Sequence, residues 1–418
     1  MGFASAYLES GALFPVFVNQ APEPQTGLII VIPAYDEPEI ELCLSSLTRC
    51  TRPPVDVEVI IIVNAPTSAG ERADECNNRT ISSINSWLGR NENLPFQLYV
   101  FNAGKPAIKG WGVGAARKTG MDEAVRRFDL LGKPEGVIVS LDSDCLVDKG
   151  YLVSIWNDFG LNLAAGGCSI CFEHRESTNP SDKTLNEAIR QYELHMRYFV
   201  ASLRYIGFPY PFHTIGSAMA VKALKYVKVG GMNRRQGGED FYFIQKLVTS
   251  DDFISLTSTT VYPSPRLSLR VPFGTGPVIS KLLSADEHTY FTYNPDSFYQ
   301  LKVLFDKFSG VTPVAYLEEV PYESLGNAIG LVIEKKEWED RYREIKNNTG
   351  TSEMFVKRFF SWFNTFMIVK FLNASHNQFY TKIPVNEAAG KMLEMSGWTD
   401  LQQSTEELLS LYRKIDRE

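Results

Sequence analysis

Residues 136–144 read GVIVSLDSD, an apolar run that ends in two aspartates. Its apolar part, Val137–Leu141, has the length and composition of a buried strand. Side chains at positions i and i+2 of an extended segment point the same way, so Asp142 and Asp144 can face one ligand. Two such carboxylates suit Mg²⁺ or Mn²⁺, which in turn binds phosphate oxygens. A turn that precedes a helix can have the same composition, so neighbouring motifs must decide between the two interpretations.

Similar apolar runs alternate with segments of helical periodicity in the first third of the chain. Leu28–Ile32 is a continuous apolar strand that Pro33 should end, and Val57–Val63 is a second strand. Between them, Glu39–Thr48 has helical spacing, and Leu98–Phe101 forms a third strand. Alternating strands and helices predict an α/β fold with a mostly parallel sheet that helices cover on both faces.

Polar residues follow three of these strands. Ligands of such sheets bind outside the carboxyl ends of the strands, where Asp36, Asn64 and Asp142 all lie. We therefore expect the functional site at this edge.

The chain changes character after a proline-rich stretch between residues 263 and 277. From about residue 280, aromatic and charged residues recur at helical spacing with no comparable strand. We expect an N-terminal extension over residues 1–26, an α/β domain over 27–279 and a mainly helical region over 280–418.

Composition excludes several classes of protein. The 418 residues are 44% hydrophobic and 22% charged, and the net charge of −7 argues against a general nucleic-acid surface. Six thinly spread cysteines predict no disulfide framework and favour reduced thiols. No run approaches the ~20 apolar residues of a membrane-spanning helix, and the first residues lack a secretory signal, so we expect a cytoplasmic protein.

Three further motifs carry candidate chemistry. After the first strand, Asp36 and Glu37 offer acceptors for a base or ribose, although acidic residues also favour a helix N-terminus. The glycine-rich segment 109–120 opens a helix, and its backbone N–H groups, with Lys109 and Arg117, suit a phosphate. It matches neither the dinucleotide fingerprint nor the P-loop, and a flexible loop with a helix cap is the alternative.

The third motif is the segment 237–240, which reads GGED and precedes a helix. Glu239 and Asp240 would lie in its first turn, where a carboxylate could deprotonate an alcohol while a metal holds a leaving diphosphate. Capping of the helix is the alternative. Further along, Arg266 and Arg270 suit a diphosphate if the segment is extended, and a solvated basic loop is the alternative.

Weaker signals come from histidines, cysteines and aromatic residues. His288, and with less weight His213, could complete a metal site with Asp144, but an isolated histidine is usually structural. The segment 168–174, with Cys168, Cys171 and His174, resembles half a zinc site, but buried thiols in a strand are the better interpretation. Aromatic residues between Phe355 and Leu372 could lie on an anionic membrane surface, although core packing is favoured.

Taken in order, these motifs resemble those of the family 2 glycosyltransferases of the GT-A fold. The resemblance extends from about Gly27 to Gly276, and no single motif is specific, but the four together are. The motifs are PAYDE (33–37), GVGAAR (112–117), DSD (142–144) and GGED (237–240), with HTIGSAMAV (213–221) and VGGM (229–232) similar to the family's acceptor side.

The resemblance implies residue roles and cofactors. Asp144 would bind Mg²⁺ or Mn²⁺, with Asp142 reaching the metal or the ribose. Asp240 would be the general base, with inversion at the anomeric carbon, and Glu239 would orient a sugar. The nucleotide would lie against the remaining candidates, namely Pro33, Tyr35, Asp36, Glu37, Asn64, Lys109 and Arg117.

The donor and the acceptor are less defined. Many family members have an aspartate that reads uracil where this chain has Asn64, whose amide offers both a donor and an acceptor, so the base preference stays open. UDP is the first candidate base carrier and GDP the second. The family's processive members carry transmembrane helices and a Gln-x-x-Arg-Trp motif, and because both are absent here, the resemblance implies transfer of a single sugar. The acceptor would be a carbohydrate, a glycolipid or another hydroxyl compound. Peripheral contact with the inner membrane face through the C-terminal region is a further expectation.

Two other classes stay open. A nucleotidyltransferase would share the sheet and the metal but should have a glycine-rich basic loop at Pro33–Tyr35. A non-catalytic sugar-nucleotide binder would be indifferent to Asp240→Asn.

Overall fold

The computed structural model describes residues 2–67, 69–249, 252–266, 274–285, 287–308, 320–399, 401 and 404–418. The chain divides into two compact units. The sheet unit comprises Met1–Ile189, Thr214–Ser284 and Arg417, and the helical unit comprises Arg190–His213, Ala285–Asp416 and Glu418. The three-part domain division expected from the sequence stays a prediction.

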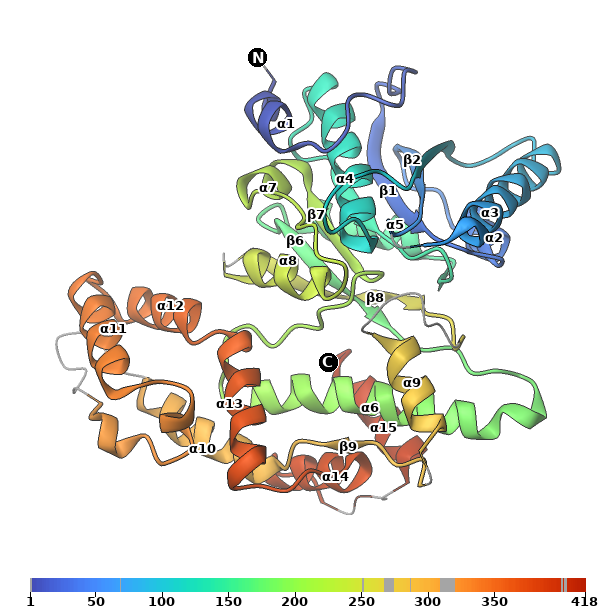
Figure 1. Ribbon diagram of the computed structural model, residues 1–418. Helices are drawn as coiled ribbons and strands as arrows, with labels where there is room; N and C mark the ends of the chain where they lie inside the picture. Colours follow the sequence, from blue (N-terminus) through green and yellow to red (C-terminus); the bar gives the residue numbers. More distant parts are fainter. Residues whose placement is uncertain are drawn as a thin grey trace. The chain divides into compact units, whose positions relative to one another are not determined.

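The sheet unit is built on one eight-stranded sheet of order β3-β2-β1-β4-β7-β6-β8-β5 (Figure 1). Six strands run in one direction, and only β7 and β5 are reversed. This confirms the expected α/β class, with a sheet that is mixed but mostly of one direction. The strands are β1 (Thr26–Ala34), β2 (Asp56–Asn64), β3 (Gln97–Gly104), β4 (Val137–Ser140), β5 (Leu146–Val147), β6 (Gly167–Phe172), β7 (Met219–Lys222) and β8 (Phe253–Tyr262).

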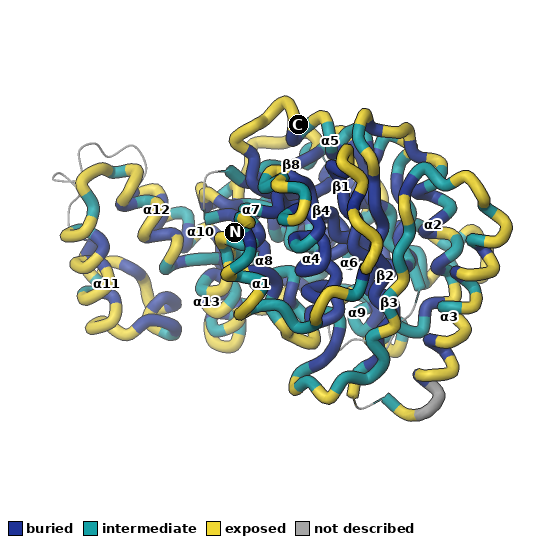
Figure 2. The backbone as a smooth tube through the Cα atoms, turned by 90° about the horizontal axis from the view of Figure 1, so that it is seen from above, coloured by how far each residue is buried: buried dark blue, intermediate teal, exposed yellow. Residues whose placement is uncertain are grey.

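Helices cover this sheet, and their packing explains why the central strands are apolar throughout. All nine residues of β1 are buried, and Figure 2 shows β1 and β4 in the buried colour. The helices of the unit are α1 (Ser5–Gly11), α2 (Ile40–Thr48), α3 (Glu71–Gly89), α4 (Val113–Leu130), α5 (Tyr151–Leu161), η1 (Pro180–Asp182), α7 (Ala223–Lys228), α8 (Glu239–Val248) and α9 (Thr275–Leu283), and α6 (Lys183–Tyr205) continues into the helical unit.

The expectation that Pro33 ends the first strand is wrong. β1 continues to Ala34, and Pro33 is in register with Ile62 of β2. Val31 accepts a hydrogen bond from the N–H of Leu141, so the backbone of Val31 faces the β4 side. The backbone groups of residues two apart in a strand face the same neighbouring strand, so the nitrogen of Pro33 also faces the β4 side. The last β4 residue, Ser140, is paired with Val31, so no β4 residue lies opposite Pro33. The missing N–H of proline therefore removes no ladder bond at this position.

The helical unit is held together largely by aromatic side chains. Core packing, the favoured interpretation of this segment, holds for Phe355, Phe359, Phe360, Phe363 and Phe371, which are buried, whereas Phe366 is 49% exposed. Its elements are β9 (Phe291–Thr292), α10 (Pro295–Phe305), η2 (Asp306–Phe308), η4 (Tyr322–Ser324), η5 (Ile329–Leu331), α11 (Lys335–Asn347), α12 (Ser352–Trp362), α13 (Thr365–Gln378), β10 (Ile383–Pro384), α14 (Val385–Met395) and α15 (Thr405–Ile415). Among the residues described, no helix is long and apolar enough to cross a bilayer.

Candidate active site at the carboxyl edge of the sheet

The ends of β1 and β2 are tied together by two asparagines. The side-chain amide of Asn64 donates to the carbonyl of Ala34 at 3.2 Å. Asn77, which belongs to α3, donates to the carbonyl of Asn64 at 2.9 Å and accepts from the N–H of Asp36 at 3.2 Å. The structure thus brings Asp36 and Asn64 together, as their positions at the carboxyl edge predict.

Asp36 has a left-handed backbone conformation, with a φ of 48°. Aspartate tolerates this region better than most residues, but it still stores strain that surrounding contacts must hold. The hydrogen bond that the N–H of Asp36 donates to Asn77 supplies one such contact. Nearby, Pro33 is buried and Tyr35 is half-buried.

Arg117 links the two acidic motifs. Its guanidinium donates to Asp142 at 3.0 Å and to Glu239 at 3.3 Å, and it also contacts Ser140 and the carbonyl of Gly216. The Arg117 side chain is only 2% exposed. Arg117, expected near the base and phosphates, therefore donates most of its hydrogen bonds to protein groups. These bonds hold Asp142, which follows β4, close to Glu239 at the start of α8.

The Asp240 carboxylate is oriented by backbone groups. One oxygen accepts from the N–H of Gly216 at 2.9 Å, and the other accepts from the N–H of Phe241 at 2.8 Å. A Cβ on Gly216 would lie 2.8 Å from the Arg117 guanidinium and 3.3 Å from Asp240, so only glycine allows this approach. The strand lead-in around residue 216 is therefore part of the site.

Burial controls the charge of the acidic pair. Removal from water raises the pKa of Asp240, against the opposing effect of the Arg117 guanidinium. Burial likewise raises the pKa of Glu239, and Arg117 again opposes it. Raised carboxyl pKa values in a site of this kind are typical of proton-transfer groups, although structural ion pairs produce them too.

Glu37 forms a fork with Arg266. The two guanidinium nitrogens lie 2.9 and 2.7 Å from the two oxygens of Glu37, which is 1% exposed. Arg266 also lies 3.9 Å from Asp144. Glu37, expected as an acceptor for a base or ribose, and Arg266, expected as a cation for a diphosphate, thus pair with each other. Arg270, the second expected cation, lies outside the described residues.

Asp142 and Asp144 remain accessible. Their side chains are 40% and 29% exposed, in contrast to the buried Glu239 on α8. Mg²⁺ is usually held by one or two carboxylates plus substrate phosphates and water rather than by a full protein cage. Two accessible carboxylates fit that pattern. Among the described residues, no group of three or more His, Cys, Asp or Glu side chains could hold a metal by itself.

The glycine-rich segment packs against the loop before α8. A Cβ on Gly114 would lie 2.3 Å from the Arg235 carbonyl, and one on Gly112 would lie 3.2 Å from Gln236. Both glycines therefore permit close contact between two protein segments. Lys109 is exposed, and its assignment to a phosphate stays a prediction.

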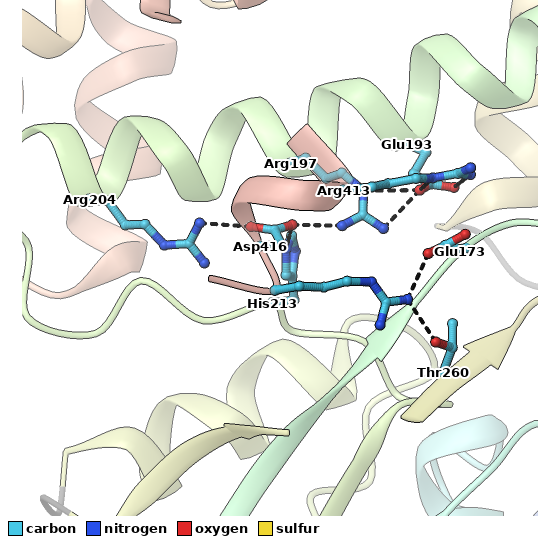
Figure 3. Close-up of polar contacts among 9 residues, drawn as sticks. Glu173, Glu193, Arg197, Arg204, His213, Thr260, Arg413 and Asp416 are labelled. Carbon is cyan, nitrogen blue, oxygen red and sulfur yellow. Dashed lines mark hydrogen bonds and ion pairs between the residues drawn. The ribbon is translucent and has the colours of Figure 1, made fainter. Parts of the chain in front are cut away.

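The two candidate histidines belong to the helical unit. His213 contacts Asp416 at 2.9 Å, and Arg197 and Arg204 contact the same carboxylate (Figure 3). This network gives His213 a structural role. His288 has a left-handed φ of 47°, and its assignment as a metal ligand is untested.

Sequence reasoning missed three residues of the site. Asn77 and Gly216 hold the strand ends and Asp240, and Arg175 donates to the Asp144 carbonyl at 3.0 Å. Arg175 follows the carboxyl end of β6, so the rule that located Asp36 and Asp142 could have found it. Asn77 lies inside a helix and carried no local signal.

The comparisons with known proteins give likenesses of structure alone. No family model matches this chain, and no curated protein matches it in sequence. S. aureus TarS in complex with UDP-GlcNAc is 15% identical, over 80% of this chain and 90% of that one, with a TM-score of 0.40. Mannosyltransferase PcManGT from Pyrobaculum calidifontis, with GDP-Man and Mn²⁺, is 12% identical over 99% and 92%, with a TM-score of 0.38.

A third similar structure is glucosyl-3-phosphoglycerate synthase from Mycobacterium tuberculosis, in complex with Mn²⁺, UDP-Glc and phosphoglyceric acid. It is 14% identical over 56% of this chain and 69% of that one, with a TM-score of 0.32.

Proposed function

We propose that this protein is a metal-dependent, inverting glycosyltransferase that moves one sugar from a nucleoside-diphosphate sugar to an acceptor hydroxyl. One observation carries the proposal: Arg117 contacts both Asp142, after β4, and Glu239, at the start of α8. A carboxylate suited to a metal-bound diphosphate and a carboxylate pair suited to proton transfer therefore meet at one place in the sheet unit.

Asp240 is the general base in this proposal. It accepts the proton of the acceptor hydroxyl while the acceptor oxygen attacks the anomeric carbon from the face opposite the leaving diphosphate, so the configuration inverts. Its two backbone hydrogen bonds hold the carboxylate in position, and its raised pKa makes it a stronger base than an exposed aspartate. Glu239, held by Arg117, orients the acceptor or the donor sugar.

Asp144, together with Asp142, would hold Mn²⁺ or Mg²⁺. The ion would supply neutralising charge for the leaving diphosphate. Of the two cations expected for the diphosphate, Arg266 already pairs with Glu37, so Arg270 is the one that remains proposed for that role.

The donor is proposed to be a UDP-sugar first and a GDP-sugar second. Asn64 and Asp36 would border the base and ribose of the donor, with Pro33, Tyr35 and Glu37 beside them. The Asn64 amide already donates to the Ala34 carbonyl, so its second amide hydrogen and its carbonyl oxygen would be the groups that pair with the edge of either base.

Thermal-shift measurements with UDP, GDP, dTDP and CMP, each with and without Mn²⁺, test the proposal. A nucleotide at a hundredfold excess over its dissociation constant should stabilise the fold by ~2.7 kcal/mol. We expect one nucleotide to stabilise the protein only with Mn²⁺, and Asp144→Asn to lose that stabilisation.

Asp56→Asn is the matched control, because Asp56 is exposed at the opposite, amino edge of the same sheet. It should keep the full shift. No stabilisation of the wild-type protein by any of the four nucleotides would reject the proposal.

A further inference from the structure

Arg175 is placed beside the Asp-Ser-Asp motif by the sheet itself. It lies three residues after the end of β6, and its backbone N–H donates to the carbonyl of Pro263, which follows β8, at 3.1 Å. β6 and β8 are parallel neighbours, so both segments leave the sheet at its carboxyl edge. This is the edge at which ligands of α/β sheets bind.

The guanidinium of Arg175 is only partly used. One nitrogen donates to the carbonyl of Asp144 at 3.0 Å, and the guanidinium makes no other hydrogen bond or ion pair with the residues that the structure describes. Its Nε is buried without a partner. A buried donor without a partner is energetically costly, so its presence in a folded protein calls for an explanation, and a bound ligand is one such explanation.

The other two arginines near this motif are committed elsewhere. Arg266 places two nitrogens on the two oxygens of Glu37. Arg117 donates to carboxylates on both sides and is almost fully buried. Of these three guanidinium groups, Arg175 retains the most unused donors, and it is half-buried rather than enclosed.

We propose that Arg175 binds phosphate oxygens of the leaving nucleoside diphosphate, and this inference rests on the proposed function. When the bond from the anomeric carbon to the diphosphate oxygen breaks, its electron pair remains on that oxygen. A guanidinium with free donors can pair with the new charge, since its planar fork matches phosphate geometry. Arg175 thus distinguishes a diphosphate from a monophosphate.

The test compares nucleoside diphosphate with nucleoside monophosphate binding by calorimetry in the presence of Mn²⁺. UDP and UMP are one pair of probes, and GDP and GMP are the other. We expect the wild-type protein to prefer the diphosphate and Arg175→Gln to reduce that preference about tenfold, since a charge-assisted bond is lost. Arg175→Lys keeps the charge without the fork and should retain part of the preference, which also covers failure of the glutamine variant to fold.

Arg52→Gln is the control, because Arg52 is an exposed arginine of the same unit. It should bind like the wild-type protein. Equal weakening of diphosphate and monophosphate binding in Arg175→Gln would mean that Arg175 only positions Asp144, and unchanged binding would remove it from the site; either result overturns the inference alone. A wild-type protein that binds none of the four nucleotides would overturn both this inference and the proposed function.

Discussion

At the scale of single residues, the site depends on a few charged groups that are removed from water. The positive charge of Arg117 offsets the negative charges of Asp142 and Glu239, and these carboxylates in turn stabilise the buried guanidinium. Removing one partner of a buried ion pair leaves an uncompensated charge. The loss of folding stability is then larger than the stability that the intact pair contributes. Two predictions follow from these contacts.

Arg117→Met should destabilise the protein by about 3–5 kcal/mol, because the buried Glu239 would lose its counter-charge. The free energy of unfolding in urea at pH 8 measures this loss. Glu239→Gln removes the uncompensated carboxylate, so the double variant should recover part of it. Additive effects of the two substitutions would show that the pair does not act as a unit.

Asp240→Asn should abolish sugar transfer, with a loss of at least ~10²-fold in kcat, while nucleotide binding is retained. In the wild-type protein, activity should fall as the pH decreases through the raised pKa of Asp240, since only the deprotonated carboxylate accepts a proton. A pH profile of kcat checks the direction. Unchanged turnover in Asp240→Asn would exclude Asp240 as the base.

At the scale of secondary-structure elements, α4 positions Arg117 because the helix lies very close to the sheet. A Cβ on Gly120 would lie 2.4 Å from the Val31 side chain of β1. The helix can therefore pack this closely on the strands only with a glycine at this position. The position of Arg117 relative to the carboxyl edge of the sheet depends on this packing.

Gly120→Ala should destabilise the fold by about 1–3 kcal/mol, since overpacking outweighs the gain in helix propensity. Gly160→Ala, in α5, is the matched control, because no atom lies within 4 Å of a Cβ there. It should be neutral or stabilising by up to about 1 kcal/mol. Thermal unfolding of both variants gives the comparison, and equal effects would contradict the packing argument.

At the scale of the whole molecule, each unit has its own network of buried charges. In the helical unit, Asp416 accepts from Arg197 at 2.6 Å and from Arg204 at 2.7 Å, and it contacts His213 (Figure 3). In the sheet unit, the buried Arg117 pairs with Asp142 and Glu239. Burial would raise the pKa of Asp416, but His213 and the arginines hold it well below its ordinary value.

The helical unit should therefore lose stability in acid. A lowered carboxyl pKa contributes stability that is present above the unfolded value of about 3.9 and is lost as the pH falls through the folded value. Asp416→Asn should destabilise the unit by about 3 kcal/mol at pH 7, and the difference from the wild-type protein should shrink below about pH 4. Hydrogen exchange of α6 and α15 at pH 7 and thermal unfolding across this range measure it; a difference that is independent of pH would contradict the assignment.

The sequence by itself determined the first four strands of the sheet and the edge at which the site is expected. Continuous apolar runs specify strands covered on both faces, and the residue after each run must lie at the carboxyl edge, so Asp36, Asn64 and Asp142 could be placed from local pattern alone. The C-terminal aromatic core was likewise readable from composition, because large apolar side chains gain most by burial.

Only the tertiary structure decided which charges pair. Arg266 and Glu37 are 229 positions apart, and no local pattern links them, because ion pairs depend on which chain segments fold side by side. For the same reason the commitment of Arg117, the unused donors of Arg175 and the attachment of His213 to Asp416 could not be predicted. The position of Pro33 inside β1 could not be predicted either, because it depends on where the neighbouring strand ends.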